Sequence, residues 1–208
     1  MTKEKSIASE RGQTVFLVED DKPVREALVD LLDSAGIAAR SFSSAEEFLV
    51  EWRPKMAGCL VLDVRLPGMS GMELQTRLTG SEVDIPIIVM TAHGDIPMVR
   101  KALKAGAIEF LTKPFQDDEL LEAVEQAFAV DRARRKQHSV AESIRARIRQ
   151  LSEREREVIQ LVTAGMTNPE IAEKLKLSVV TVKLYRGSAM QKMRANSLAD
   201  LVKMWEKQ

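Results

Sequence analysis

Residues 58–71 read GCLVLDVRLPGMSG, and their pattern indicates how the first half of the chain folds. The apolar run at 59–62 predicts a strand buried on both faces, which is typical of a parallel sheet covered by helices on either side. The strand ends on a carboxylate, Asp63, just before a proline–glycine turn. Either Asp63 caps the segment that follows, or it presents a reactive group at the end of the strand. The remaining sequence has to distinguish these two interpretations.

Similar apolar runs recur through residues 14–129 and alternate with segments of helical periodicity. The other expected strands are TVFLVED (14–20), ARSF (39–42), IPIIVM (85–90) and IEFLTKPF (108–115). In the first helical segment, Pro23 suits the first turn and Gly36 suits the C-terminal end. Ser44 and Glu47 have the spacing of a capping box at the start of the second. Five strand–helix repeats predict an α/β fold, a doubly wound five-stranded parallel sheet.

Ligands bind at the carboxyl ends of the strands in a doubly wound fold. The side chains expected there are polar: Glu19, Asp20, Asp21, Asp63, Thr91 and Lys113. A single terminal aspartate would be unremarkable. Carboxylates, a hydroxyl and an amine at one edge of a sheet are more than helix capping requires, which favours the reactive interpretation of Asp63.

The charges of this group indicate its chemistry. Neighbouring carboxylates repel and raise one another's pKa, and a divalent cation removes that repulsion. Mg²⁺, or Mn²⁺ in its place, prefers such oxygen ligands and combines them with phosphate oxygens. Lys113 would supply a compact positive charge and Thr91 a hydroxyl donor. A carboxylate in this setting can act as a nucleophile toward phosphorus and form an aspartyl phosphate.

Residues 14–129 resemble the receiver domain of two-component response regulators. The resemblance rests on the polar positions at the strand ends and on MTAHGDIPMVRKALKAGAIEFLTKPF (90–115), which is especially close to the FixJ branch. It implies that Asp63 is the phosphoacceptor and that Lys113 pairs with the phosphate. It further implies that Thr91 and Phe110 are the switch residues.

The same resemblance implies a metal site and a backbone feature. The metal ligands would be Glu19, Asp20, Asp63 and the backbone carbonyl of Arg65, and Glu19 stands where many receivers have aspartate. The Lys113–Pro114 peptide bond would be cis. A sensor histidine kinase would be the phosphate donor.

The net charge of zero hides a division along the chain. Residues 14–128 carry 20 acidic and 11 basic side chains, a net charge of −9, whereas residues 129–208 carry 9 acidic and 17 basic, a net charge of +8. Halves of opposite sign indicate two domains with different partners, the basic one a candidate for nucleic acid. A plain solvated basic face is the alternative.

The second half reads as a helical linker followed by a bundle of short helices. The linker, 130–148, lacks proline and glycine and carries many charges, with a break expected near 137–139. Ser152 and Glu155 have capping-box spacing, and Asn168 and Ser178 are expected to cap the next two helices. Two helices joined by a short turn at KLS indicate a helix-turn-helix.

Residues 150–205 resemble the LuxR-type helix-turn-helix of FixJ and NarL regulators through LSEREREVIQLV, TNPEIAEKL and TVKLYRGSAMQKM. The resemblance implies that the helix from about Val179 to Arg194 enters the major groove of DNA. Gly187 departs from the polar or basic residue that the family often has, and Tyr185 from its histidine. The expected DNA contacts are Thr181, Lys183, Leu184, Tyr185 and Arg186.

Composition excludes a membrane protein and a secreted disulfide scaffold. Apolar runs stay well below the roughly 18 residues of a membrane span. Residues 1–13 lack the apolar core of a signal peptide and predict a flexible tail. The single cysteine, Cys59, cannot form an internal disulfide. We therefore expect a cytoplasmic protein, with no membrane partner, in four parts: tail, receiver (14–129), linker (130–148) and DNA-binding domain (149–208).

The leading interpretation is a phosphorylation-controlled transcription regulator, not an enzyme beyond phosphorylation and dephosphorylation of Asp63. Phosphorylation would shift the receiver toward a homodimer that binds paired half-sites in promoter DNA, with RNA polymerase a further candidate partner. Two alternatives stay open. One is a metal-dependent phosphatase with an aspartate nucleophile, although Arg65 stands where such enzymes commonly have a second acid. The other is a DNA binder that does not depend on phosphorylation.

Overall fold

The structure is a computed structural model that describes residues 12–79, 85–92 and 96–206. The predicted flexible tail lies outside the described residues except for Gly12 and Gln13. The chain forms two compact units, residues 1–134 and 135–208. None of the helices in the described ranges combines the length and apolar character that crossing a membrane requires.

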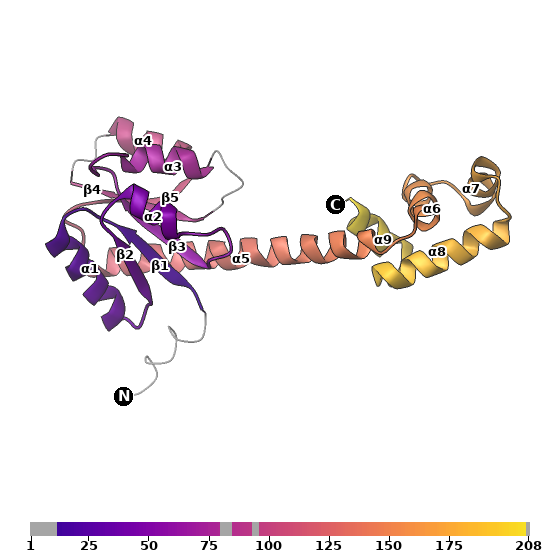
Figure 1. Cartoon of the computed structure of the whole chain (residues 1–208), viewed down its shortest axis with the longest axis horizontal. Coiled ribbons are helices and arrows are strands. Elements are labelled where there is room, and N and C mark those ends of the chain that lie inside the picture. The colour runs from indigo at the N-terminus through magenta and orange to yellow at the C-terminus, as the bar shows by residue number, and fades with distance from the viewer. Residues whose placement is uncertain (1–11, 80–84, 93–95, 207–208) are drawn as a thin grey trace. The chain divides into compact units, whose positions relative to one another are not determined.

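The first unit is a five-stranded parallel sheet with helices on both faces, in the strand order β2-β1-β3-β4-β5 (Figure 1). This arrangement confirms the predicted doubly wound α/β fold. Its elements are β1 Thr14–Val18, α1 Lys22–Ser34, β2 Ala39–Phe42, α2 Ala45–Glu51, β3 Gly58–Asp63, α3 Gly71–Thr79, β4 Ile87–Thr91, α4 Ile96–Lys104, β5 Ala107–Thr112 and the part of α5 (Asp117–Arg149) that lies before residue 135.

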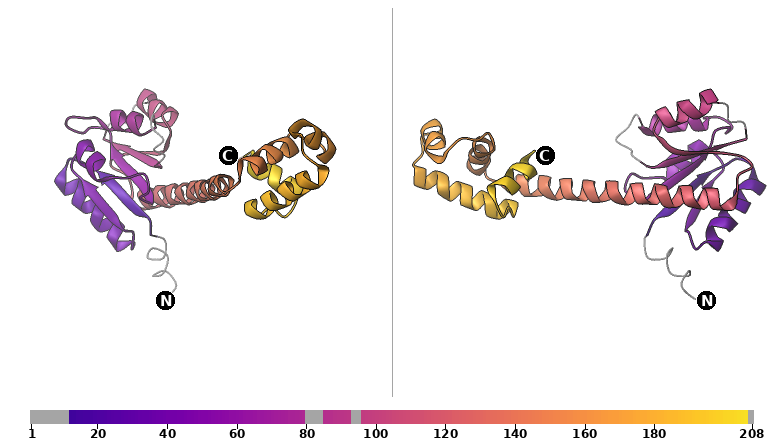
Figure 2. Two further views of the ribbon diagram at one scale, coloured as in Figure 1. Left: turned by 45° about the vertical axis from the view of Figure 1, so that its right-hand side comes forward. Right: turned by 180° about the vertical axis from the view of Figure 1, so that it is seen from behind.

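Helices cover both faces of the sheet (Figure 2), and alternate side chains of the strands enter two separate apolar cores, one on each face. On β3, Leu60 and Leu62 pack with α2, α3 and α4, whereas Cys59 and Val61 pack with α1 and α5. The strand is fully buried, as its unbroken apolar sequence predicts. Burial removes the Cys59 thiol from water and raises its pKa far above the usual range.

Local signals set the helix boundaries. The Asp21 side chain caps α1 by accepting a hydrogen bond from the Val24 N–H at 3.1 Å. Pro23 lies in the first turn of the helix, as predicted. Gly36 adopts a φ of 71°, which favours glycine at the end of a helix. Ser44 caps α2 as predicted.

Helix α5 is 33 residues long and runs without interruption through residues 137–139, so the predicted break there is wrong. The segment contains neither proline nor glycine, and nothing interrupts its hydrogen bonds. Asp131, which is fully buried, anchors the helix in the first unit. Its carboxylate accepts hydrogen bonds from the Gly58 N–H at 3.0 Å and from Gln13 Nε2 at 3.1 Å, and pairs with Arg134.

The second unit contains four short helices after the end of α5 in the described residues: α6 Glu153–Thr163, α7 Asn168–Leu175, α8 Val179–Met193 and α9 Leu198–Trp205. Ser152 and Glu155 form the predicted capping box of α6, and Ser178 caps α8 as predicted. The expected cap Asn168 is wrong, because Thr167 caps α7 and Asn168 is its first helical residue. Glu170 accepts hydrogen bonds from both the amide and the hydroxyl of Thr167 at 2.7 Å, which fixes this boundary.

Candidate functional site

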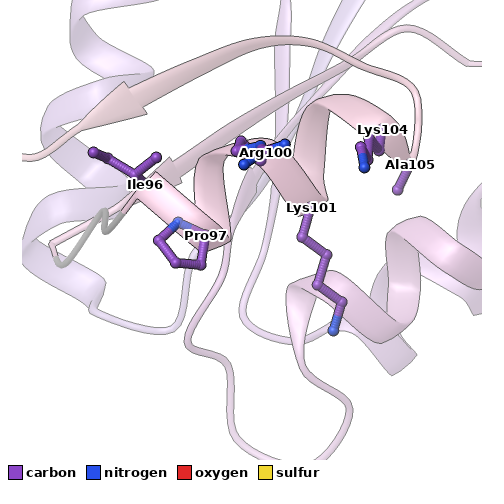
Figure 3. Close-up of a pocket in the computed structure, with 6 residues that line it drawn as sticks. All are labelled: Ile96, Pro97, Arg100, Lys101, Lys104 and Ala105. Atoms are coloured by element: carbon purple, nitrogen blue, oxygen red, sulfur yellow. The ribbon is translucent and has the colours of Figure 1, made fainter.

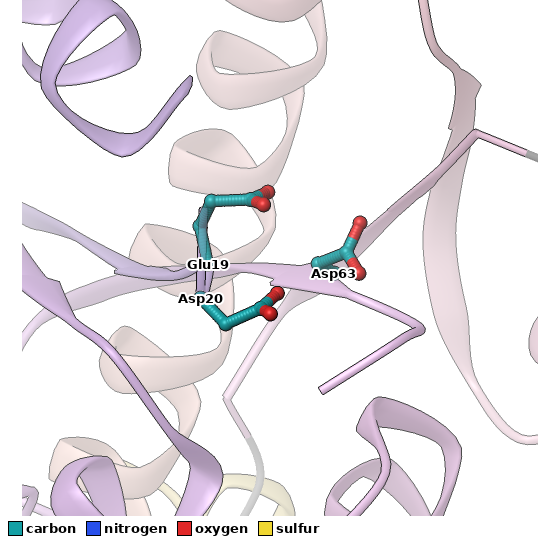
Figure 4. A group of neighbouring side chains, drawn as sticks. All are labelled: Glu19, Asp20 and Asp63. Atoms are coloured by element: carbon teal, nitrogen blue, oxygen red, sulfur yellow. The ribbon is translucent and has the colours of Figure 1, made fainter. Parts of the chain in front are cut away.

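Acidic side chains converge where β1 and β3 end, at the point in the sheet where the chain reverses its direction of winding. Glu19 and Asp20 follow β1, and Asp63 is the last residue of the neighbouring strand β3. One carboxylate oxygen from each residue lies within 4.8 Å of the others, and the side chains of Glu19 and Asp20 extend toward Asp63 (Figure 4). The crevice at such a reversal is where doubly wound folds bind ligands.

Lys113 completes the group from the end of β5. Its Nζ lies 2.7 Å from Oδ1 of Asp63 and 2.5 Å from Oε2 of Glu19. Glu19 and Asp63 are only 2% and 5% exposed, so the ammonium group compensates two carboxylates that water barely reaches. The structure thus brings together four of the residues singled out in the sequence.

The environment changes the pKa values of Glu19 and Lys113. Burial raises the pKa of Glu19, and the hydrogen bond and charge of Lys113 offset this only in part. Burial acts to lower the pKa of Lys113, but the hydrogen bonds and charges of Asp63 and Glu19 outweigh it and raise that pKa. The lysine is therefore held in its charged form at neutral pH.

Asp63 does not cap the following helix. Its Oδ2 accepts the N–H of Arg65 at 2.7 Å, within the loop that follows β3. Ser70 and Glu73 cap the start of α3 instead. The Glu73 carboxylate accepts the Ser70 N–H, and the Ser70 hydroxyl accepts the Glu73 N–H. Asp63 therefore accepts one amide of the loop that follows it but is not the cap of α3, and its carboxylate lies among the charged groups at the sheet edge.

Two further residues shape the site and escaped the sequence analysis. Arg25 on α1 donates to the backbone carbonyls of Glu19 at 2.7 Å and Asp20 at 3.1 Å. Gly71 begins α3 directly against the strand end, where an added Cβ would lie 2.1 Å from the Asp63 carbonyl oxygen. A glycine shortly after a strand is a signal for such close approach, whereas nothing in the sequence identifies Arg25.

The predicted switch residues lie on β4 and β5. Thr91 is fully buried at the end of β4, and its carbonyl accepts the backbone N–H of Lys113 at 2.7 Å. Phe110 on β5 is partly buried and packs against the core that α2, α3 and α4 cover. The Lys113–Pro114 peptide bond is cis, as the resemblance implies.

The donor set suits a divalent cation. Glu19, Asp20 and Asp63 offer three carboxylate oxygens close together, and oxygen is the ligand that Mg²⁺ and Mn²⁺ prefer. Two of the three carboxylates are buried and one is exposed, so the group is open to solvent on the Asp20 side. Arg65 is exposed, and its carbonyl remains a predicted ligand.

In the second unit, the residues predicted to contact DNA lie on α8 but not on one face. Lys183 and Leu184 are exposed, whereas Thr181, Tyr185 and Arg186 are partly buried. The Thr181 hydroxyl lies 2.8 Å from that of Ser178, which caps the same helix. Tyr185 packs against the core between α6, α7 and α8. Arg186 Nη1 donates a hydrogen bond to Asn168 Oδ1 at 3.4 Å.

A buried carboxylate positions α8 against α6. Glu155, which is 4% exposed, accepts hydrogen bonds from the Ser188 hydroxyl at 2.6 Å and from Lys192 Nζ at 2.7 Å. It also accepts the Ser152 amide at 2.7 Å. Burial acts to raise the pKa of Glu155, but these hydrogen bonds outweigh it and lower that pKa to about 2. The orientation of α8 therefore depends on an ionised carboxylate.

Comparisons with known families match both units. The family described as "Response regulator receiver domain" matches residues 15–125. The family described as "Bacterial regulatory proteins, luxR family" matches residues 149–205, a range that contains all of α6 to α9.

Individual relatives match the chain over most of its length. It is 48% identical over 192 residues to Nodulation protein W of Bradyrhizobium diazoefficiens, and the aligned region covers 92% of this chain and 85% of that protein. It is 44% identical over 191 residues to the transcriptional regulatory protein FixJ of Rhizobium meliloti, covering 92% and 94%. The solved structure of the response regulator StyR superposes with a TM-score of 0.84 at 48% identity, covering 95% of this chain and all of that one. The chain therefore belongs to the FixJ branch of two-component response regulators, and it is a phosphorylation-controlled, DNA-binding regulator of transcription.

Proposed function

We propose that Asp63 is the phosphoacceptor of this regulator and that a phosphohistidine of a sensor histidine kinase is the donor. The observation that carries the proposal is the convergence of Glu19, Asp20, Asp63 and Lys113 at the point where β1 and β3 end. Asp63 is the last residue of β3 and contacts both the lysine and a loop amide. A nucleophile held in this way needs no further activation beyond neutralisation of the incoming charge.

In the proposed transfer step, Asp63 is the nucleophile and the phosphohistidine imidazole is the leaving group. A carboxylate oxygen of Asp63 attacks phosphorus, the P–N bond of the phosphohistidine breaks, and the imidazole nitrogen keeps the electron pair and takes up a proton. Lys113 pairs with an oxygen of the new acyl phosphate. Mg²⁺ bound by Glu19, Asp20, Asp63 and the carbonyl of Arg65 would neutralise phosphate charge.

The switch is proposed to follow from the same charges. The Thr91 hydroxyl at the end of β4 would donate to a phosphate oxygen, and Phe110 would pack further inward on β5. Phosphate acts only through the difference in its interaction with the two states of the receiver, so the outcome is a shift in populations.

Two pockets on neighbouring elements support a homodimer as the active state. An open pocket of about 660 Å³ along α4 carries only basic charges, from Arg100, Lys101 and Lys104 (Figure 3). A smaller pocket of about 260 Å³ between β5 and α5 carries only acidic charges, including Glu109 and Glu122. Charge complementarity of this kind allows the α4 surface of one copy to meet the β5–α5 surface of another in a two-fold interface.

Dimerisation would place two copies of α8 on paired half-sites of promoter DNA, with RNA polymerase a candidate for later contact. We assign residues 14–129 to the receiver, 130–148 to the linker helix and 149–208 to the DNA-binding domain. The phosphatase alternative is not favoured, because the residue two positions after the nucleophile is Arg65, which cannot serve as a general acid.

Labelling by a small phosphate donor tests the central proposal. Wild-type chain and Asp63→Asn are incubated with acetyl phosphate and Mg²⁺, and the bound phosphate is quantified and mapped by mass spectrometry. We expect one phosphate per chain on Asp63, none in Asp63→Asn, and none after chelation of Mg²⁺. Label on Asp20 or Asp21, or continuous turnover of generic phosphate esters, would refute the assignment. Circular dichroism of Asp63→Asn establishes that the variant is folded.

A further inference from the structure

Gln75 is a buried polar residue where α3 and α4 lie side by side (Figure 1). Its side chain is fully buried, and its neighbours Leu74 and Leu78 belong to the apolar core that α2, α3 and α4 cover. Its Nε2 donates a hydrogen bond to the Ala102 carbonyl of α4 at 2.8 Å. Within the described part of the chain, its Oε1 has no hydrogen-bond partner. Because a buried amide that is satisfied at one end only costs free energy, packing alone does not account for Gln75.

The hydrogen bond from Gln75 closes the C-terminal end of α4. The last carbonyls of a helix have no partner inside the helix. If α4 continued, the Gly106 N–H would bond the Ala102 carbonyl. It bonds the Leu103 carbonyl instead, at 3.0 Å, and Gln75 supplies the donor for Ala102. This end of α4 is therefore tied to α3 by a single side chain.

The same face of α3 also contacts the end of β3. Gly71 lies one helical turn before Gln75, so the two residues share a face of the helix. The Gly71 N–H donates to the Val64 carbonyl at 3.0 Å, and an added Cβ on Gly71 would lie 2.1 Å from the Asp63 carbonyl oxygen. Since the two backbones leave no space between them, a shift of the peptide that joins Asp63 and Val64 has to move the start of α3.

We propose that Gln75 restrains α4 in the unphosphorylated receiver and that α3 transmits the state of Asp63 to this restraint. The inference rests on the proposed phosphorylation of Asp63. Phosphate bound there displaces the backbone against which α3 begins, the hydrogen bond between Gln75 and Ala102 breaks, and α4 is released. The unpaired Oε1 keeps the restraint weak, because an amide that leaves this contact can satisfy both of its ends. The connection runs through α3 and is separate from Thr91 on β4.

Hydrogen exchange of α4 tests the restraint. Full-length wild type and Gln75→Met are compared with and without acetyl phosphate and Mg²⁺, and deuterium uptake of peptides that cover α4 is measured by mass spectrometry. Methionine keeps an unbranched side chain but removes both ends of the amide. In wild type, we expect phosphorylation to raise the exchange rate of the last turn of α4. In unphosphorylated Gln75→Met this rate should already be about fivefold higher, as expected for the loss of one hydrogen bond, and phosphorylation should add little.

Matched measurements separate a restraint from a contribution to packing. Thr76→Val removes a hydrogen bond to the Met72 carbonyl on the exposed side of α3 and should leave the exchange of α4 unchanged. In urea denaturation, Gln75→Met should be close to wild type, because the substitution removes one unpaired acceptor, Oε1, and leaves another at Ala102. Gln75→Leu, a second apolar substitution, should give the same result.

The outcomes distinguish failure of the inference from failure of the proposed function. Wild-type exchange of α4 in both Gln75 variants would overturn the inference, as would faster exchange throughout the receiver with a matching loss of stability. The inference would also be wrong if phosphate mapped to Asp63 left α4 of the wild type unchanged. In each of these cases phosphorylation of Asp63 stands. Absence of phosphate on Asp63 would overturn the proposed function and the inference together.

Discussion

Lys113 Nζ lies 2.7 Å from Asp63 Oδ1, so that an ion pair reaches from the end of β5 across the intervening β4 to the end of β3. The same ammonium group contacts Glu19 beyond β1. The single positive charge of Lys113 therefore compensates two buried carboxylates. Removal of Lys113 would leave both carboxylates without a compensating charge.

Replacing Lys113 by methionine should consequently destabilise the first unit and make its stability depend on metal. Breaking a buried ion pair costs about 3–5 kcal/mol, because the remaining charge is uncompensated. We expect Lys113→Met to unfold at lower urea concentration than wild type in chelator, and Mg²⁺ to restore more stability to the variant than to wild type. Lys22→Met, whose side chain is 71% exposed on α1, serves as the control and should show neither effect. Equal gains from Mg²⁺ in all three chains would contradict the proposed metal ligands.

Two glycines allow the same substitution with opposite expected results. At Gly71, an added Cβ would lie 2.1 Å from the Asp63 carbonyl oxygen, so Gly71→Ala has to displace the end of β3 or the start of α3. At Gly187, the same Cβ meets no atom within 4 Å. We expect Gly71→Ala to lower the free energy of unfolding and the rate of labelling at Asp63. Gly187→Ala should instead raise the stability of the second unit by about 1 kcal/mol, since alanine favours helix. Both values come from urea denaturation, and unimpaired labelling of Gly71→Ala would contradict the proposed close approach.

Charge reversal tests the proposed dimer. Lys104→Glu on α4 and Glu122→Lys on α5 should each weaken self-association of the phosphorylated chain, because like charges then face each other across the interface. The double variant should recover a large part of the loss. Analytical ultracentrifugation of the chain phosphorylated with acetyl phosphate measures the dissociation constants. Lys22→Glu on α1 changes the net charge equally and should have little effect. If the double variant is as weak as the sum of the single variants, the two residues do not face each other in the dimer.

Glu155 predicts how acid affects the second unit. Its pKa is lowered from 4.5 to about 2 in the folded chain, so the stability it contributes is complete above pH 4.5 and is lost as the pH falls toward 2. Glu155→Gln should cost about 1.5–3 kcal/mol at neutral pH, as for hydrogen bonds to charged groups, and should flatten the pH dependence below 4.5. Fluorescence of Trp205 in a Trp52→Phe background reports on this unit alone. Glu157→Gln, on the same helix and paired with exposed Arg154, is the control.

The sheet and the polar residues at the carboxyl ends of its strands could be predicted from the sequence because short local patterns determine both. Unbroken apolar runs mark buried parallel strands, and the polar residue after each run must lie at the common edge. The contributions of Arg25 and Gly71 could not be read in this way, because each depends on which distant backbone atoms the folded chain brings close. The predicted cap of α7, Asn168, was one residue too late for a different reason. Thr167 and Asn168 are both good capping residues, and only the hydrogen bonds of Glu170 distinguish them.

The helix-turn-helix shows a similar limit. Periodicity identified α8 but not which of its faces packs against α6 and α7. Three of the five expected DNA contacts, Thr181, Tyr185 and Arg186, are therefore partly engaged within the protein. The expected break in α5 failed because charge and polarity alone do not interrupt a helix that lacks proline and glycine.

The burial of Cys59 has a practical consequence for anyone who wishes to observe this regulator at work. It is the single cysteine of the chain, it is fully buried, and its thiol resists ionisation. Maleimide dyes react with the thiolate, so we expect them to leave Cys59 unmodified in the folded protein. A cysteine introduced at an exposed position would then take up one fluorophore selectively, without prior removal of the natural thiol. Slow modification of Cys59 itself would report how often the centre of the sheet opens to solvent.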